Sequence, residues 1–151
     1  MLEAAKNSGP GPTLSQVVAL ITDSDWREAV AVMRALRPTL VTEEFVARRP
    51  QLLSDGYNLL GVRVAEQVVS LASYTISPHV TLGRELLIHD MATLPDFRGQ
   101  GHASALISEL VRIAAQSGCG RLFVHTRNAQ KLYTRSGFQE YSSGMIRRLD
   151  R

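Results

Sequence analysis

Residues 91–103 read Met-Ala-Thr-Leu-Pro-Asp-Phe-Arg-Gly-Gln-Gly-His-Ala, and they are the most informative stretch of the chain. It leaves an apolar strand, makes a short turn and enters a helix whose first backbone amides lack intrahelical partners. Gly99 and Gly101 have no Cβ atoms to hold a ligand away from the backbone. Arg98 adds a forked cationic donor. Because a helix start carries partial positive charge, the stretch is typical of a phosphate-binding loop.

The loop differs from the two commonest nucleotide-binding loops. It has no Gly-Lys-Ser/Thr, which excludes a Walker-type loop, and it does not read Gly-x-Gly-x-x-Gly. It reads Arg98-x-x-Gly101-x-Ala103, and in this form it resembles the acyl-coenzyme A loop of the GNAT superfamily of N-acetyltransferases. Residues 128–133 (Asn-Ala-Gln-Lys-Leu-Tyr) and 136–138 (Ser-Gly-Phe) are similar to that family's late segment. The order and spacing of these parts fit the family over nearly the whole chain.

Length and composition indicate one ordinary globular domain. The chain has 151 residues, of which 44% are hydrophobic and 21% charged, enough for a single core. Its net charge is +3, and the basic residues are scattered along the chain, without the basic run typical of nucleic-acid binding. Residues 1–13 lack the apolar stretch of a signal peptide. We predict a flexible tail over residues 1–13, a single N-acetyltransferase domain over residues 14–151 and a cytoplasmic location.

Other classes of partner are not expected from the sequence. The longest apolar runs are too short to cross a membrane, and no nucleic-acid partner is expected. Cys119 is the single cysteine, which excludes an internal disulfide, and the four histidines lack metal-ligand spacing. We therefore expect no metal.

Hydrophobic periodicity predicts an α/β fold. Two β-branched runs joined at Ala65-Glu66 form a hairpin, whereas the strand–helix–strand unit 85–126 requires a parallel crossover. We therefore predict a mixed, mostly antiparallel sheet of about six to seven strands with helices on both faces, which is also what the GNAT resemblance implies. The expected strands are 16–21, 57–64, 67–77, 85–93, 121–126 and 138–149, and the expected helices begin near residues 23, 42, 101 and 128.

The resemblance implies acetyl-CoA as co-substrate. In the family, the pantetheine arm pairs with the backbone at the end of the strand before the loop, and the phosphates lie on the loop and helix start. The Ser104 hydroxyl either contacts a phosphate or is an ordinary first-turn serine. The residues implied to bind the cofactor are Met91, Ala92, Thr93, Arg98, Gly99, Gln100, Gly101, His102, Ala103, Ser104 and Asn128.

The late segment departs from the family pattern in one place. The family's asparagine comes seven residues before the tyrosine, where this chain has Thr126, whereas Asn128 is only five residues before Tyr133. A deletion of about two residues in this turn accounts for the difference. It weakens the expected contact of Asn128 with the coenzyme, and to a lesser degree the placement of Tyr133.

Tyr133 is the candidate general acid. A phenol with a pKa of about 10 can protonate a departing thiolate, and the resemblance implies a tyrosine near the thioester sulfur. The alternative is that Tyr133 packs as an amphipathic aromatic residue.

Two residues compete as the general base. Glu85 lies thirteen residues before Arg98, a spacing at which several family members carry a catalytic glutamate. His89 titrates near neutrality. Strand alternation places Glu85, His89 and Met91 on one face and Asp90 on the other, where it is structural. Glu85 and His89 would stand about 13 Å apart, at about 3.3 Å per residue. For each, a purely structural polar role is the alternative.

Together these features predict an acetyl-CoA-dependent N-acetyltransferase that works by direct attack in a ternary complex. The acceptor is expected to be a primary amine of a small molecule. The alternatives are a non-catalytic acyl-CoA-binding or regulatory module, and a peptide or protein N-acetyltransferase. Because pairing through the last strand is common in the family, a homodimer is left open.

Overall fold

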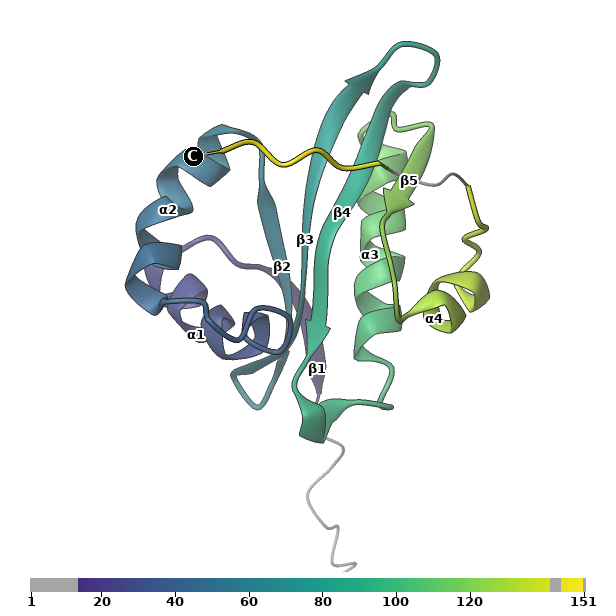
Figure 1. The fold of residues 1–151 in the computed structure, drawn as a ribbon. Helices are drawn as coiled ribbons and strands as arrows, with labels where there is room; N and C mark the ends of the chain where they lie inside the picture. Colours follow the sequence, from purple (N-terminus) through teal and green to yellow (C-terminus); the bar gives the residue numbers. More distant parts are fainter. Residues whose placement is uncertain (1–13, 142–144, 151) are drawn as a thin grey trace, which may run out of the picture.

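The computed structural model describes residues 14–141 and 145–150, so the tail predicted over residues 1–13 lies outside the described residues. Five strands form one sheet in the order β1-β2-β3-β4-β5 (Figure 1). The first three pairings are antiparallel and β4 pairs with β5 in parallel, as predicted for the crossover unit. The strands are β1 (Ser15–Ala19), β2 (Asn58–Val64), β3 (Gln67–His79), β4 (Gly83–Thr93) and β5 (Arg121–Val124).

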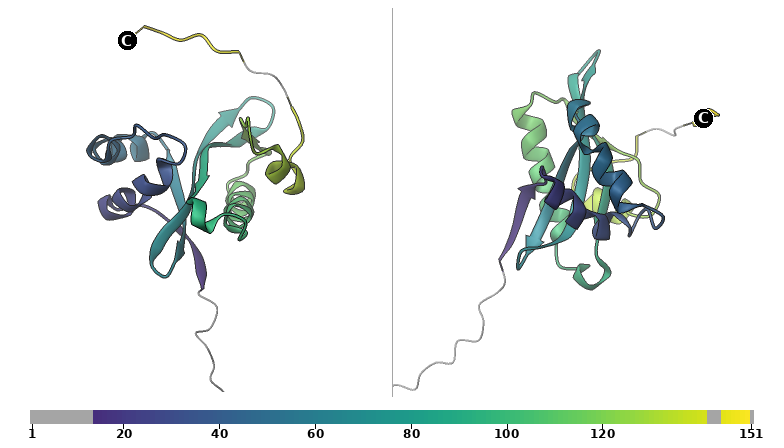
Figure 2. Two further views of the ribbon diagram at one scale, coloured as in Figure 1. Left: turned by 60° about the horizontal axis from the view of Figure 1, so that its bottom comes forward. Right: turned by 90° about the vertical axis from the view of Figure 1, so that its left-hand side faces the viewer.

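Helices cover both faces of the sheet, which confirms the predicted layers. On one face lie α1 (Asp23–Met33) and α2 (Thr42–Ser54), and on the other α3 (His102–Gln116). The views in Figure 2 show these two layers on opposite sides of the strands. The short helix α4 (Gln130–Arg135) follows β5, and a 3-10 turn, η1 (Pro95–Phe97), precedes α3. Among the described residues, no helix combines the length and apolar character needed to span a membrane.

Each face has its own hydrophobic core. Trp26 anchors the α1/α2 side: its ring stacks on Phe45 at 4.7 Å, and its Nε1 donates to the Leu20 carbonyl at 3.0 Å. Leu106 and Leu110 of α3 are fully buried in the core on the other side. The sheet is therefore held from both faces, which gives β4 and the start of α3 a rigid base.

The predicted strand over residues 138–149 is wrong for the residues that the structure describes. Residues 138–141 and 145–150 form no strand, so the described sheet has five strands rather than six or seven. The apolar side chains of this segment are exposed (Met145, Ile146 and Leu149), and Figure 2 shows its end away from the body of the protein. Because these side chains gain no burial against the sheet, apolar character alone does not make the segment a strand.

A β-bulge at His89 changes the alternation of side chains in β4. Asp90 pairs with Ser73 and Ile88 pairs with the next residue, Tyr74, which leaves His89 without a partner in β3. Such an extra residue shifts every later side chain to the opposite face. Ile88 packs in the core on the α3 side, whereas Ala92 packs in the core on the α1/α2 side. The expectation that Asp90 and His89 lie on opposite faces, and Met91 with His89, is therefore wrong.

Candidate active site

The start of α3 is built by two glycines in left-handed conformations. Gly99 has φ 73°, and Gly101, the residue that begins the helix, has φ 85°. A Cβ on either glycine would meet no atom within 4 Å, so the conformation and not the space requires glycine here. The first helical bond runs from the Ala105 amide to the Gly101 carbonyl at 3.0 Å, and no side chain caps the helix. The amides of residues 102–104 therefore have no intrahelical acceptor.

The first turns of the other two long helices contain acidic residues, whereas that of α3 does not. Thr22 and Asp25 form a capping box at the start of α1, and Asp23 adds a second acid to its first turn. The first turn of α2 contains Glu43 and Glu44. The first turn of α3 contains no acidic residue. Within its own first turn, the positive end of α3 therefore has no counter-charge, which suits an anionic ligand.

Side chains of the loop tie it to the end of β4. Arg98 donates from Nε to the Thr93 carbonyl at 3.2 Å, and Gln100 donates to the Asp96 carbonyl at 3.2 Å. Arg98 is exposed, so its guanidinium lies at the surface beside the uncapped helix start. Arg98, Gly99, Gln100 and Gly101 are thus brought together in one tight turn, as predicted.

The next three predicted residues take different positions. The His102 side chain is buried, with its ring 6.4 Å from that of Phe97, and its Nε2 has no hydrogen-bond partner among the described residues. Only the backbone amide of His102 therefore faces the helix end. Ala103 is partly buried. Ser104 lines a hollow of about 540 Å³ between α3 and α4, together with Arg135.

β4 continues beyond its partner β5 toward the loop. The two strands pair from Glu85–Arg121 to Ile88–Val124, where β5 ends, while β4 runs on to Thr93. Within the described part of the chain, Met91, Ala92 and Thr93 have a strand partner only on the β3 side. An extended ligand can therefore add to the other edge through main-chain hydrogen bonds.

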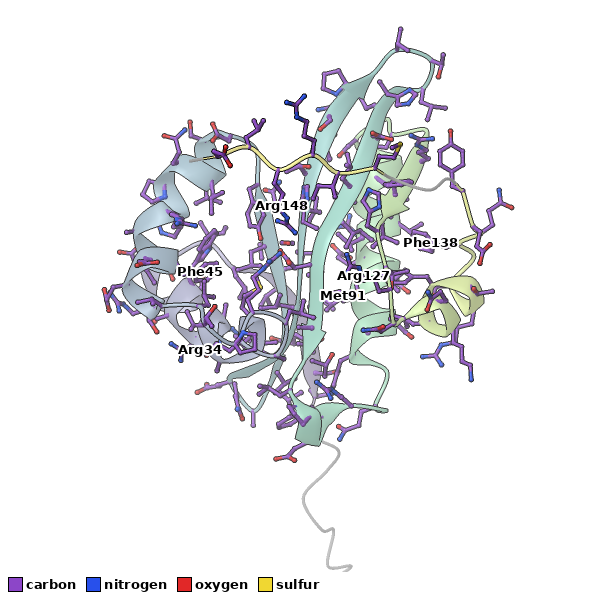
Figure 3. The ribbon with its side chains drawn as sticks, viewed as in Figure 1. Arg34, Phe45, Met91, Arg127, Phe138 and Arg148 are labelled. Carbon is purple, nitrogen blue, oxygen red and sulfur yellow. The ribbon has the colours of Figure 1, made fainter. Side chains whose placement is uncertain are left out.

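Tyr133 reaches from α4 to this part of β4. Only 6% of the residue is exposed. Its hydroxyl donates to the Met91 sulfur at 3.8 Å, and its ring meets Phe138 edge-on at 5.3 Å; Figure 3 labels both neighbours. A thioether is a weak acceptor, so the phenolic proton is not committed to a strong partner. Burial raises the pKa of Tyr133, which keeps it protonated at neutral pH.

Thr126 and Asn128 take different positions in the turn before α4. Thr126 accepts the Ala129 amide at 3.1 Å. Asn128 is exposed, and no hydrogen bond of its side chain is seen within the described residues. Thr126 thus stabilises the turn that leads into α4.

Glu85 is committed to an ion pair at the far end of β4. Arg121 donates to its carboxylate at 2.7 Å, and also lies 3.4 Å from His79 Nε2. The same guanidinium is stacked over the Tyr141 ring at 4.8 Å. Glu85 and His89 share the α1/α2 face of β4, but they do not contact one another.

His89 lies beside a buried carboxylate that the sequence analysis did not assign to the site. Only 8% of Asp90 is exposed, and it accepts hydrogen bonds from Arg37 at 2.6 Å, Ser73 at 2.8 Å and Tyr57 at 3.2 Å. No local pattern links Arg37 with a residue 53 positions later, so the sequence held no signal for this cluster. Partial burial lowers the pKa of His89, which is therefore neutral at pH 7.

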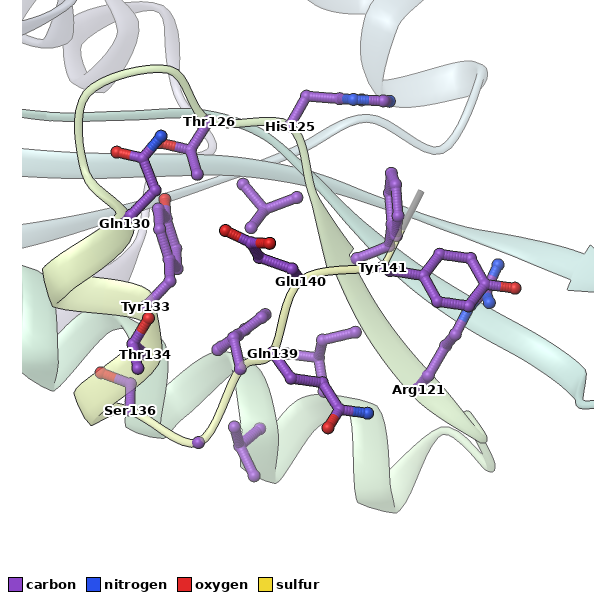
Figure 4. Close-up of a pocket in the computed structure, with 16 residues that line it drawn as sticks. Arg121, His125, Thr126, Gln130, Tyr133, Thr134, Ser136, Gln139, Glu140 and Tyr141 are labelled. Atoms are coloured by element: carbon purple, nitrogen blue, oxygen red, sulfur yellow. The ribbon is translucent and has the colours of Figure 1, made fainter. Parts of the chain in front are cut away.

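A second, larger hollow lies beside β5. It has a volume of about 790 Å³ and is lined mainly by β5, α4 and residues 136–141 (Figure 4). Tyr133 is the one predicted site residue in its wall. The hollow therefore marks the uncovered edge of β5 rather than the anion site at α3. Among the described residues, no three His, Cys, Asp or Glu side chains are arranged to hold a metal ion.

Comparison with known families identifies the family of this chain. The family model described as "Acetyltransferase (GNAT) family" matches residues 21–138. The chain belongs to this family. The match includes β4, the loop, α3 and Tyr133, so the candidate site of this GNAT protein lies entirely within the matched region.

Two curated relatives match part of this GNAT chain. One is the uncharacterized N-acetyltransferase YycN of Bacillus subtilis, 33% identical over 70 residues, which are 44% of this chain and 45% of the relative. The other is the thialysine N-epsilon-acetyltransferase of Bos taurus, 30% identical over 77 residues, 48% of this chain and 45% of the relative. Each match spans less than half of the relative's length.

Solved structures extend the likeness to almost the whole fold. The aminoglycoside N-acetyltransferase AAC(6')-Iy, solved in complex with CoA, superposes with a TM-score of 0.81 over 93% of this chain and 98% of that structure. Its sequence identity to this chain is 18%, so the likeness concerns the fold.

Proposed function

We propose that this GNAT protein is an acetyl-CoA-dependent N-acetyltransferase that acts on a primary amine of a small molecule. The observation that carries the proposal is the uncapped, uncharged start of α3 directly beside the unpaired edge of β4. The first suits the phosphates of the coenzyme and the second suits its extended pantetheine arm. Thialysine and aminoglycosides, named in the relatives and in the solved structure, are small amines, which supports the acceptor class.

The proposed chemistry needs one base and one acid. The bound thioester supplies the acetyl group to the amine nitrogen, and the bond to sulfur breaks. His89 takes the proton from the amine and, being exposed, passes it to water. Tyr133 gives its phenolic proton to the departing thiolate. Because burial disfavours a tyrosinate, Tyr133 regains a proton before the next turnover.

We propose His89 rather than Glu85 as the general base. The Glu85 carboxylate accepts from Arg121 at 2.7 Å, and taking a proton would remove the negative charge that this ion pair needs. Within the described residues His89 makes no ion pair, and its lowered pKa makes the neutral form available at pH 7.

Thermal unfolding with acetyl-CoA tests the donor site. Acetyl-CoA at a hundred times its dissociation constant is expected to stabilise the protein by about 2.7 kcal/mol, a shift of a few degrees. ATP and NAD at matched concentrations serve as controls. No shift with acetyl-CoA, or an equal shift with all three ligands, would contradict the proposal.

Thiol release from acetyl-CoA then tests the transfer. We expect release to depend on added amine, with thialysine and neamine as small acceptors and a peptide with N-terminal alanine as the protein-like acceptor. Turnover with the peptide alone would favour a peptide N-acetyltransferase. Stabilisation by acetyl-CoA with no turnover on any amine would favour a non-catalytic acyl-CoA-binding module.

The pH dependence of the reaction should report His89. The pKa of His89 is lowered from 6.5, so the base is active above this lowered value and is lost as the pH falls through it. We expect the ratio of kcat/KM of the wild type to that of His89→Gln to cancel the ionisation of the amine and of Tyr133. The ratio should rise with pH to about a hundredfold, with its midpoint below pH 6.5. A midpoint above pH 6.5, or a ratio that stays near one, would remove His89 from the mechanism.

A further inference from the structure

Thr75 makes the one side-chain hydrogen bond of His89 within the described residues. Its Oγ1 lies 2.7 Å from His89 Nε2. Thr75 is on β3, where it pairs with Leu87 of β4, two residues before His89. Alternation along β4 places His89 on the same face as Leu87, so its side chain lies diagonally opposite Thr75. The bulge that follows leaves Asp90 on this face as well.

The rest of the imidazole is held by packing. The Tyr57 ring stacks on it at a centroid distance of 6.0 Å and an angle of 22°. The Tyr57 hydroxyl is in turn held by Asp90 at 3.2 Å. Stacking fixes the plane of the ring, and the bond to Thr75 fixes its rotation within that plane. In the described part of the chain, no hydrogen bond to Nδ1 is seen.

Only one of the two neutral forms of His89 can act as a base in this arrangement. A neutral imidazole has one N–H group and one lone pair, and a hydroxyl both donates and accepts. If Nε2–H donates to Thr75, the lone pair is on Nδ1 and is free. If instead Thr75 donates to Nε2, Nδ1 carries the hydrogen and no free lone pair is left.

We propose that Thr75 is a positioning residue whose hydroxyl accepts the Nε2–H bond of His89, so that Nδ1 takes the proton of the acceptor amine. This inference rests on the proposed role of His89 as base. When the proton moves from the amine nitrogen to Nδ1, the bond to Thr75 is kept and the ring does not have to turn. The ionisable groups packed around the ring are Asp90, Tyr57 and, through its bond to Asp90, Arg37. The Asp90 oxygens are hydrogen-bonded to Arg37, Tyr57 and Ser73, whereas the hydrogen bond of His89 is to Thr75, so Thr75 rather than the carboxylate sets the tautomer.

Nitrogen-15 NMR of the histidine side chains tests the proposal without acetyl-CoA or amine. Measured above the pKa of His89 in the full chain, with His89 assigned by its loss in His89→Gln, the wild type is expected to show the Nε2–H tautomer. Thr75→Val, which keeps the shape but removes the hydroxyl, should shift the resonances toward a mixture of tautomers. Thr75→Ser should restore the wild-type pattern. An Nδ1–H tautomer in the wild type, or unchanged shifts in Thr75→Val, would overturn the proposal.

Kinetics with the best amine of the panel provides the second readout. We expect Thr75→Val to lower kcat about tenfold, a part of what a general base supplies, with KM for acetyl-CoA unchanged and with Thr75→Ser close to the wild type. Thr81→Val is the matched control, because Thr81 Oγ1 contacts a different histidine, His79, at 3.3 Å; it should change neither kcat nor the His89 resonances. Full activity of His89→Gln would refute the base while the tautomer result still stood, so the two failures are distinguishable.

Discussion

Gly101→Asp is expected to abolish acetyl-CoA binding while the protein stays folded. The new carboxylate would lie at the start of α3, where the phosphates are proposed to bind. At about 4 Å, two like charges repel by about 4 kcal/mol at an effective dielectric constant of 20, or a loss of affinity of about a thousandfold. A Cβ at this position meets no atom within 4 Å, and aspartate tolerates left-handed backbone better than most residues. Calorimetric titration with acetyl-CoA measures the effect.

Two matched variants separate charge from backbone strain. Gly101→Asn has nearly the same size and backbone preference as Gly101→Asp but no charge, and should lose much less affinity. Gly83→Asp places the same charge at a glycine with a similar φ of 76° at the other end of β4, and should bind normally. Equal losses in Gly101→Asp and Gly101→Asn would show that shape, not charge, controls binding. Wild-type affinity in Gly101→Asp would refute the phosphate loop.

Tyr133→Phe is expected to lower kcat about a hundredfold, within the range for general acid catalysis, with the dissociation constant for acetyl-CoA unchanged. The variant keeps the ring, and so keeps its edge-on contact with Phe138. It loses only a hydroxyl whose partner is the Met91 sulfur at 3.8 Å, so stability should change little. A loss confined to kcat would therefore belong to the chemical step.

Tyr141→Phe is the control for Tyr133→Phe. Tyr141 lines the same hollow, but 69% of it is exposed and its ring lies over Arg121. It should turn over at the wild-type rate. If Tyr133→Phe also turned over at the wild-type rate, Tyr133 would be a packing residue and the thiolate would have to take its proton from water.

The parts of the molecule that sequence predicted well are those whose structure is set locally. The phosphate-type loop depends on Gly99 and Gly101, whose left-handed conformations follow from the residue type itself. The apolar stripe of α3 follows from helical periodicity within 15 residues. The family and the mixed sheet with helices on both faces are confirmed, because they depend on such local segments and their order.

The parts that sequence missed depend on distant partners. The bulge at His89 exists only in the pairing of β4 with β3, and alternation along β4 alone cannot reveal it. Asp90 was assigned to the wrong face for this reason, and its contact with Arg37 joins residues 53 positions apart. The segment 138–149 contains apolar residues, but its composition does not determine whether it pairs with the edge of β5. The roles of Tyr133, Glu85 and His89 stay predictions.

The empty start of α3 also has a consequence for local motion. A side-chain cap contributes about 1 kcal/mol to a helix, and α1 has one where α3 has none. We therefore expect the first turn of α3 to open more readily than that of α1 in the free protein. An anion bound there would accept hydrogen bonds from the free backbone amides and would reduce this local opening. The ligand would in this way complete the secondary structure of the protein as well as occupy its surface.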